Sequence, residues 1–510
     1  MSKAKCIMVQ GTMSGAGKSL LCAALCRIFA QDGYRVAPFK SQNMALNSFV
    51  TRDGLEMGRA QVVQAQAAGI EPDVRMNPIL LKPSSDVGSQ VIVNGEVRGQ
   101  MPAAAYFKMK RSLIPEILSA YNSLAETVDI IVIEGAGSPA EINLKADDIV
   151  NMGLARLVDA PVLLAGDIDR GGVFAQLYGT VALLEPEERA RIKGLLINKF
   201  RGDVEILRPG LAMLEEKTQL PVLGVVPYLK VDIEDEDSLS TRLDAGKTVH
   251  PLDAAILRLP HISNFTDFMP LEQHPLLGVR YVQNTRQLGT PDLIILPGTK
   301  NTVDDLLWLR QSGLEAALLK LAANGTPVLG SAAGIRCWAR HWPTLRARRA
   351  VRRRLCGGWG CCPPRTVFTG QKHRTQDTAA VTAAPFAGAA LTGYQIHTGR
   401  TEVQGVPFCT LADGTPEGCV QDNVFGTYLH GLFDTGELTE KLVALLCRRK
   451  GIAPDSAASS RWSSTASSSL TCWPMACAAR WIWMPFTRPW GWRTRGGMHN
   501  DPTTSSARRH

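Results

Sequence analysis

Short, wholly apolar runs alternate with longer mixed segments through the first 230 residues of the chain. A strand buried on both faces of a parallel sheet is apolar throughout, and the longer segments between such strands have room for a covering helix. Several runs end in glycine or polar residues, as strands do at the ligand-binding edge of an open α/β sheet. The pattern predicts a mostly parallel sheet with helices on both faces and strands at 5–10, 129–134, 161–167 and 221–227. A second strand is predicted to begin at residue 36, and a fifth to begin at residue 194 and end at Asn198 and Lys199.

The apolar pattern stops near residue 231 and resumes near residue 251. The intervening segment, 231–250, is acidic and polar without apolar periodicity, and we interpret it as a linker. It separates an N-terminal domain at 1–230 from a second domain at 251–450. Apolar runs at 252–260, 293–296 and 327–329 predict strands in the second domain, and glycine turns follow the last two of them. The second domain is therefore also predicted to be α/β.

The composition is that of a soluble globular protein, and 510 residues suffice for two or three domains with substantial cores. No apolar run reaches the ~18 residues of a membrane helix, and no signal-peptide pattern is present, so we expect a cytoplasmic protein without a membrane partner. The 12 cysteines do not predict a disulfide framework in so long a chain, and Cys356, Cys361 and Cys362 are not expected to hold a metal. Much of the +9 charge comes from 346–354, so no nucleic-acid partner is expected.

A glycine-rich turn separates the first predicted strand from an apolar helix. Strand, glycine turn and helix are what a phosphate-binding loop requires, because backbone N–H groups and the helix N-terminus receive phosphate oxygens. Lys18 is expected to neutralise phosphate charge, and the Ser19 hydroxyl to ligate Mg²⁺. The spacing resembles the GTxxxxGK[ST] loop of dethiobiotin-synthetase-like ATPases, and the alternative is a glycine turn with a chance Lys-Ser pair. The candidate ATP-binding residues here are Gly11, Thr12, Gly15, Gly17, Lys18 and Ser19.

Polar residues at other strand ends extend this candidate site. Glu134 ends a buried strand, where a Walker-B-like carboxylate holds Mg²⁺ or its water. Asp53 lies in a segment, 53–61, that is expected to open a helix, and it is a second candidate magnesium ligand together with Ser19. Lys40 follows the second strand, and Asn198 and Lys199 end the fifth, where they are suited to binding a nucleotide.

Four long motifs in the N-terminal half resemble the signatures of the cobyric acid synthase family, glutamine-hydrolysing amidotransferases of cobalamin biosynthesis. The similarity runs almost unbroken from about residue 5 to residue 330. It implies a P-loop-type (dethiobiotin-synthetase-like) parallel-sheet domain followed by a class I glutamine amidotransferase-like α/β domain. The motifs are 38–44, 134–144, 167–174 and 198–203.

The resemblance implies a reaction, two cofactors and two substrates. The family amidates the b, d, e and g carboxylates of adenosylcobyrinic acid a,c-diamide and gives adenosylcobyric acid. ATP, with Mg²⁺, activates each carboxylate, and glutamine supplies the ammonia. The expected partners are thus a corrinoid and glutamine, and the oligomeric state stays open.

Motifs near the end of the second domain match the family's glutaminase half. His430 falls at the position of the general base, and His397 is expected to be structural or to support the site, with Gln395 in place of the family's acid. The residue two after His430 is not the usual glutamate, so a Cys–His dyad is expected. Backbone N–H groups of 297–302 are candidates for the oxyanion hole.

The nucleophile position departs from the family. The family's run after Pro-Val-Leu is Gly-Ile-Cys-Gly-Gly-Tyr-Gln-Met-Leu-Gly, and here Ala332 occupies the position of the cysteine. Deleting one base from a coding sequence for that run yields residues 330–339 as they stand. We interpret 331–363 as a frameshifted segment, with a compensating shift near residue 363. Neither Ser331 nor Cys337 is expected to replace the thiol, so the chain as written is predicted to lack glutaminase activity.

A second frameshifted segment is predicted at 456–510, within an aberrant tail, 451–510, that is expected to be disordered. Tryptophan usage supports both assignments, because of the 10 tryptophans only Trp308 lies outside 331–363 and 456–510. A leucine codon CTG that is displaced by one base reads as TGG, the tryptophan codon. The rival interpretation is genuine divergence to a surface rich in tryptophan and arginine.

Two other functions stay open at this point. Cobyrinic acid a,c-diamide synthase shares the two-domain plan. The N-terminal position of the phosphate loop and the 38–44 motif nevertheless favour the cobyric acid synthase family. A non-catalytic ParA/MinD-like nucleotide-binding protein uses the same kind of loop, but it gives no reason for a glutaminase-like half.

Overall fold

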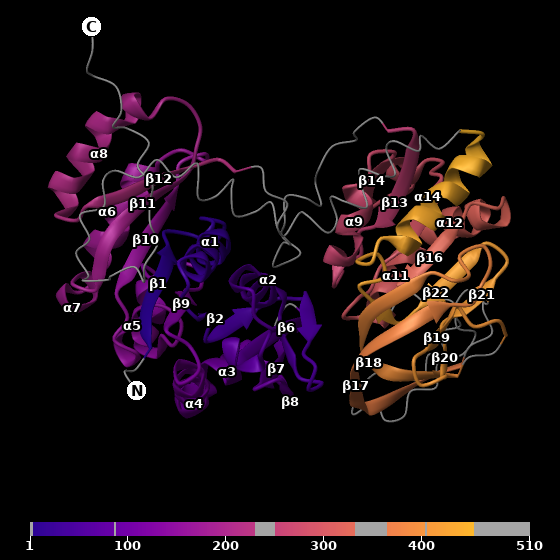
Figure 1. The fold of residues 1–510 in the computed structure, drawn as a ribbon, viewed down its shortest axis with the longest axis horizontal. Helices are drawn as coiled ribbons and strands as arrows, with labels where there is room; N and C mark the ends of the chain where they lie inside the picture. The colour runs from indigo at the N-terminus through magenta and orange to yellow at the C-terminus, as the bar shows by residue number, and fades with distance from the viewer. Residues whose placement is uncertain (1–3, 86–87, 230–249, 332–364, 403–404, 453–510) are drawn as a thin grey trace, which may run out of the picture.

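The computed structural model describes residues 4–85, 88–229, 250–331, 365–402 and 405–452. Figure 1 shows two α/β bodies, one before residue 229 in indigo to magenta and one after residue 250 in rose to yellow. The predicted linker, the segment 331–363 and the tail 451–510 lie almost entirely outside the described residues. Among the helices that are described, none is long and apolar enough to cross a membrane.

A six-stranded sheet forms the centre of the first body. Its strand order is β12-β11-β10-β1-β9-β2, and every neighbouring pair is parallel. This confirms the mostly parallel sheet predicted from the apolar runs. The strands are β1 (Lys5–Gly11), β2 (Val36–Phe39), β9 (Ile130–Glu134), β10 (Val162–Asp167), β11 (Ile192–Phe200) and β12 (Val222–Pro227).

Both faces of this sheet are buried, which explains why its strands are apolar throughout. Alternate residues point to opposite faces, so Met8 and Ile131 belong to one core cluster while Val9 and Val132 belong to the other. The helix α1 (Lys18–Gln31) covers the Val9 face. The Met8 face is covered by α4 (Ile114–Ala125), α5 (Met152–Leu157), α6 (Val173–Leu183) and α8 (Val204–Thr218), and α7 (Pro186–Arg189) is a short connection.

A long excursion between β2 and β9 builds a second, smaller sheet in the first body. It has the order β3-β6-β7-β8, and a separate hairpin pairs β4 with β5. The strands are β3 (Gln42–Met44), β4 (Ser48–Val50), β5 (Glu56–Gly58), β6 (Ile79–Ser85), β7 (Gly88–Val93) and β8 (Glu96–Pro102). The helical segments are α2 (Arg59–Ala68), η1 (Val74–Met76), α3 (Ala103–Met109), η2 (Lys110–Leu113) and, after β9, η3 (Ile142–Asp147).

The helix predicted to open within 53–61 begins later than expected. Residues 56–58 form β5 and pair with β4, so the helix α2 starts at Arg59. Gly54 adopts a φ of 74° in the turn of this hairpin, a conformation that favours glycine and ends any helical path from Asp53. The acidic residues at 53 and 56 therefore belong to a hairpin and not to a helix N-terminus.

The second body contains two sheets. The first has the order β14-β13-β15-β16-β22-β21 and is parallel except for its last pair, and the second, β20-β19-β17-β18-β23, is antiparallel. The strands are β13 (Leu252–Leu257), β14 (Leu277–Val282), β15 (Leu293–Leu296), β16 (Val328–Ser331), β17 (Arg365–Val381), β18 (Ala390–Glu402), β19 (Cys409–Leu411), β20 (Pro416–Glu417), β21 (Cys419–Gln421), β22 (Val424–Thr427) and β23 (Leu429–His430). The helical segments are η5 (Phe265–Phe268), α9 (Met269–Glu272), α10 (Thr285–Leu288), α11 (Thr302–Gln311), α12 (Leu314–Ala323) and α14 (Glu437–Lys450).

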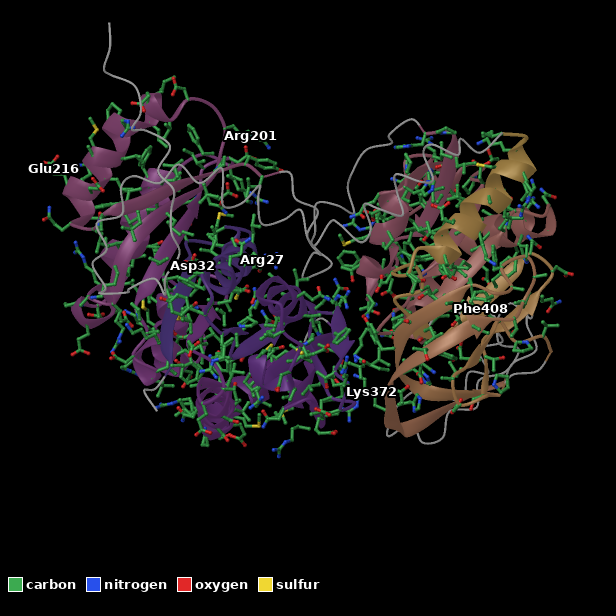
Figure 2. The ribbon with its side chains drawn as sticks, in the orientation of Figure 1. Arg27, Asp32, Arg201, Glu216, Lys372 and Phe408 are labelled. Carbon is green, nitrogen blue, oxygen red and sulfur yellow. The ribbon has the colours of Figure 1, made fainter. Side chains whose placement is uncertain are left out.

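Buried charges join the two bodies. The Glu56 carboxylate of the first body accepts hydrogen bonds from Lys82 Nζ at 2.9 Å and from Lys372 of the second body, whose label stands between the bodies in Figure 2. Lys300 Nζ of the second body donates to Gln90 Oε1 at 2.7 Å. Burial acts to raise the pKa of Glu56, but the lysine charges outweigh it and hold the pKa well below its usual value. Burial lowers the pKa of Lys372 to about 8.

The hairpin β4–β5 also reaches the second body through neutral hydrogen bonds. The backbone carbonyl of Ser48 accepts from the Tyr394 hydroxyl at 2.9 Å and from Asn264 Nδ2 at 3.1 Å. Both donors are buried. The hairpin therefore contacts the part of the second body that carries the predicted base, as described below.

Candidate functional site

The phosphate loop has the conformation that its glycines predict. Gly15 and Gly17 have φ values of 77° and 90°, in the left-handed region where a side chain is strained. At Gly17 a Cβ would also lie 2.1 Å from Asn198 Nδ2. The helix α1 begins at the next residue, Lys18, so its N-terminus faces the loop. Free helical N–H groups at this end favour an anionic ligand.

A cavity of about 1040 Å³ opens over the loop. Most of the predicted ATP-site residues line this cavity. The sequence alone placed them only at the ends of separate strands. Gly11 is the exception, because it ends β1 beneath the loop, where a Cβ would lie 3.0 Å from the Ala16 Cβ. The predicted residues that line the cavity are Thr12, Gly15, Gly17, Lys18, Ser19, Lys40, Glu134, Asn198 and Lys199.

The Glu134 carboxylate is the most heavily hydrogen-bonded group of the cavity. It is 1 % exposed and accepts from Ser19 Oγ at 2.8 Å and Lys40 Nζ at 3.0 Å through one oxygen. Its other oxygen accepts from Gln64 Nε2 at 2.5 Å and Gln61 Nε2 at 3.4 Å. Burial acts to raise the pKa of Glu134, but the Lys40 charge and these hydrogen bonds outweigh it and keep the carboxylate ionised.

The residues fit a nucleotide. Lys18 Nζ lies within 3.1 Å of the carbonyl oxygens of Met13 and Gly137 and lines the cavity with its charge. Asn198 Nδ2 donates to the Ala16 carbonyl at 2.8 Å, while its Oδ1 is buried without a hydrogen-bond partner among the described residues. Such an acceptor beside the cavity suits the amino group of a base. Lys199 Nζ bonds the Gly15 carbonyl and Asp167 Oδ2, both at 2.7 Å, and so supports the loop.

Two of the three candidate magnesium ligands lie together, and the third lies apart from them. Ser19 and Glu134 meet, and they supply the hydroxyl and carboxylate oxygens that Mg²⁺ accepts together with phosphate oxygens and water. Asp53 does not join them, because it is exposed in the β4–β5 turn and does not line the cavity. The described residues contain no cluster of three His, Cys, Asp or Glu side chains that could hold a metal by themselves. A metal here would thus depend on oxygens of the nucleotide.

His430 of the second body has a carboxylate partner that the sequence did not suggest. Its Nδ1 lies 2.6 Å from Asp267 Oδ2, and both side chains are buried. The Tyr394 ring stacks on the imidazole with centroids 5.1 Å apart. A buried carboxylate on one ring nitrogen orients the imidazole and leaves the other nitrogen to act as a base. The arrangement differs from the expected dyad, in which His430 had no acidic partner.

Asp267 was missed because the family's acid is sought two residues after the histidine. Asp267 instead lies in η5, 163 residues earlier in the chain. The one available signal was the polar run at 263–267, which follows a predicted strand at its carboxyl end. The His397 ring packs against the Tyr428 ring, and its Nε2 lies 3.1 Å from Gln395 Oε1. These contacts are those of a structural residue.

Ser331 is the last described residue before the nucleophile position. Strand β16 pairs in parallel with β22, so that Ser331 stands opposite Thr427, three residues before His430. Ala332 itself lies outside the described residues. In the candidate oxyanion run, the N–H of Lys300 donates to the His261 carbonyl and that of Asn301 to Thr299 Oγ1. Those two N–H groups are therefore engaged within the loop.

Removing the Asp267 carboxylate is expected to destabilise the second body. In Asp267→Ala, His430 Nδ1 stays buried without its partner, which costs about 1–3 kcal/mol, whereas Asp267→Asn keeps an acceptor oxygen and loses less. Native-state hydrogen exchange at β16 and β22 measures this, because it resolves the stability of one body within the chain. Equal protection of these strands in Asp267→Ala and the unsubstituted chain would contradict the expected role.

Family models match both halves of the chain. A model of the CobQ/CobB/MinD/ParA nucleotide binding domain matches residues 7–240, and one of the CobB/CobQ-like glutamine amidotransferase domain matches residues 253–438. Among solved structures, PurLQS from Thermotoga maritima covers 38% of this chain and 99% of its own at 17% identity and a TM-score of 0.31, too low to bear on the assignment.

Curated relatives match most of the chain. The cobyric acid synthase of Lachnoclostridium phytofermentans is 55% identical over 88% of this chain and 92% of its own. That of Ruminiclostridium cellulolyticum is 54% identical over 88% and 90%, and that of Listeria monocytogenes serotype 4b (strain F2365) is 50% identical over 88% and 89%. With a nucleotide-binding half and a glutamine amidotransferase half in the family's order, the chain belongs to the cobyric acid synthase family of amidotransferases.

Proposed function

We propose that the chain catalyses ATP-dependent amidation of the b, d, e and g carboxylates of adenosylcobyrinic acid a,c-diamide, giving adenosylcobyric acid. The observation that carries this proposal is the convergence of Lys18, Ser19, Lys40 and Glu134 on one cavity. These residues place two cations and an ionised carboxylate around a phosphate loop. Cations and a carboxylate that can hold Mg²⁺ stabilise the charge of a phosphoryl group during its transfer, so this arrangement favours phosphoryl transfer over simple nucleotide binding.

The reaction needs two steps at this cavity. A corrinoid carboxylate attacks the γ-phosphorus of ATP, which forms an acyl phosphate and releases ADP. Ammonia then attacks the acyl carbon, and inorganic phosphate leaves as the amide forms and the nitrogen loses a proton. Lys18 and Lys40, which line the cavity, would neutralise the charge on the transferred group, and Ser19 and Glu134 would hold the Mg²⁺ that shields the phosphates.

Glutamine is the proposed source of ammonia for the intact family product. In that reaction a cysteine thiolate attacks the glutamine amide, and His430, oriented by Asp267, carries the proton. The chain as written keeps His430 but has Ala332 at the position of the thiol. We therefore propose that this chain takes ammonia from solution.

Phosphate release from ATP tests the proposal against its two rivals. With ammonium present, adenosylcobyrinic acid a,c-diamide is expected to stimulate release, while DNA and anionic vesicles leave it unchanged. Stimulation by cobyrinic acid without its a,c-diamide would instead favour the a,c-diamide synthase. Stimulation by DNA or vesicles alone would favour the ParA/MinD-like alternative.

A further inference from the structure

Three of the side chains that line the large cavity are apolar and remain exposed. Met44 is 55 % exposed, Phe107 40 % and Leu144 41 %, and all three line the same cavity as the phosphate loop. They come from three separate elements, β3, α3 and η3. Large apolar side chains that converge on a cavity from separate elements indicate a ligand that covers them. The triphosphate of ATP is not such a ligand, because it is charged throughout.

A buried lysine, Lys110, lies beside Phe107, one of these apolar side chains. Lys110 is 8 % exposed, and its Nζ lies 4.4 Å from the centre of the Phe107 ring and lines the cavity. Within the part of the chain that the structure describes, its ammonium has no ion pair within 4.0 Å and no hydrogen bond within 3.5 Å. Burial lowers the pKa of this ammonium, and the charges of Asp147 and Asp148 act in the opposite direction. A buried cation without a close anion favours a ligand that brings one.

The aspartates do not supply that anion. Both oxygens of Asp148 are held by backbone N–H groups, Oδ1 by Val150 and Asn151 and Oδ2 by Gly153, at 2.8–2.9 Å. These bonds engage both oxygens of Asp148 within the loop after η3. Lys110 lies over the Phe107 ring, which attracts a cation but does not neutralise it.

We propose that these residues form the corrinoid subsite, in which Met44, Phe107 and Leu144 contact a face of the corrin ring and Lys110 binds a carboxylate on its rim. The inference rests on the proposed function. A corrinoid combines a broad apolar macrocycle with carboxylates at its edge, and the site offers the complement of both. The cavity, about 1040 Å³, is at the upper limit of ordinary ligand pockets and has room beyond a nucleotide.

The placement also satisfies the reaction. Phosphoryl transfer requires the corrinoid carboxylate and the γ-phosphate to meet, so both ligands must share one cavity. If Lys110 holds one rim carboxylate while another lies at the phosphate loop, the ring is oriented by a contact remote from the reacting atoms. Lys110 is then a positioning residue for the reaction and not a catalytic one.

Equilibrium dialysis of the full chain with adenosylcobyrinic acid a,c-diamide tests the inference. Lys110→Met is expected to weaken binding about tenfold or more, because it removes a charged hydrogen-bond donor. Lys108→Met, an exposed lysine two residues earlier that does not line the cavity, should leave binding unchanged. Adenosylcobyric acid has amides at b, d, e and g and keeps one other acid on the rim, so loss of the Lys110→Met effect with it would assign Lys110 to one of those four carboxylates.

Phe107→Ala and Met44→Ala probe the apolar contact. Both should weaken the acid and the amidated corrinoid alike, while Met213→Ala, an exposed apolar residue of α8 away from the cavity, should not. ATP binding is measured in every variant, and its retention shows that the fold is intact. If Lys110→Met loses ATP binding, Lys110→Arg replaces it and is expected to retain corrinoid binding.

Different results would contradict the proposed function and the corrinoid subsite. Absence of corrinoid binding by the unsubstituted chain would contradict the proposed function and the subsite with it. Normal binding that responds to Lys110→Met no more than to Lys108→Met, with Phe107→Ala also unchanged, would overturn the subsite alone.

Discussion

Glu134→Gln is expected to reduce ATP-dependent amidation by roughly 10²- to 10³-fold with ammonium as the nitrogen source, the scale of removing one electrostatic stabiliser from an active site. The carboxylate is buried among Ser19, Lys40 and Gln64, and hydrogen bonds keep it ionised. Glutamine has almost the same shape but no charge. It can neither balance the charge of Lys40 nor supply the carboxylate that would hold Mg²⁺ together with Ser19.

Steady-state phosphate release and corrinoid amidation measure this effect. Glu216→Gln is the matched control, because Glu216, labelled in Figure 2, is exposed on α8 and does not line the cavity. The loss should appear in kcat, since the charge matters most as the phosphoryl group transfers. A Glu134→Gln enzyme with near-normal kcat would refute the role of this carboxylate.

Glutamine is expected to support no amidation by the chain as written, while ammonium does. Loss of a nucleophile that acts with a base costs on the order of 10⁴-fold or more, and Ala332 offers no atom that can attack the glutamine amide. His430 and Asp267 cannot compensate, because a base without a nucleophile can activate only water. The measurement is ammonia release from glutamine, with amidation followed in parallel.

The decisive control is the same chain with 331–363 returned to the other reading frame, which restores Gly-Ile-Cys-Gly-Gly at the turn. That enzyme should hydrolyse glutamine. Substantial glutamine turnover by the chain with Ala332 would contradict the assignment of the nucleophile. An unbroken frame on resequencing the gene around codons 325 to 370 and after 455 would contradict the frameshift interpretation.

The features that could be predicted from the sequence are local ones. The apolar runs identify all six strands of the first sheet because burial on both faces leaves no other pattern. The phosphate loop is a continuous motif, and Glu134 ends a strand next to the one that carries it, so their convergence follows from parallel order. The sequence therefore predicted most of the residues that line this cavity, while Gly11 and Asp53 lie outside its lining, and their roles in ATP binding stay a prediction.

The features that could not be predicted depend on tertiary contacts between distant segments. In the sequence, Asp53 and Glu56 have the pattern of an acidic first helical turn, but the pairing of β4 with β5 overrides that pattern. Asp267 meets His430 only because η5 packs against the second sheet. The lysines around Glu56 come from both bodies, and no periodicity links them.

The proposed function is tested most directly by the mass of the corrinoid after incubation with this chain, ATP, Mg²⁺ and ammonium. Starting from adenosylcobyrinic acid a,c-diamide, the proposal predicts ATP-dependent conversion of the b, d, e and g carboxylates to amides. An unchanged corrinoid in the presence of a chain that is folded and binds ATP would contradict it.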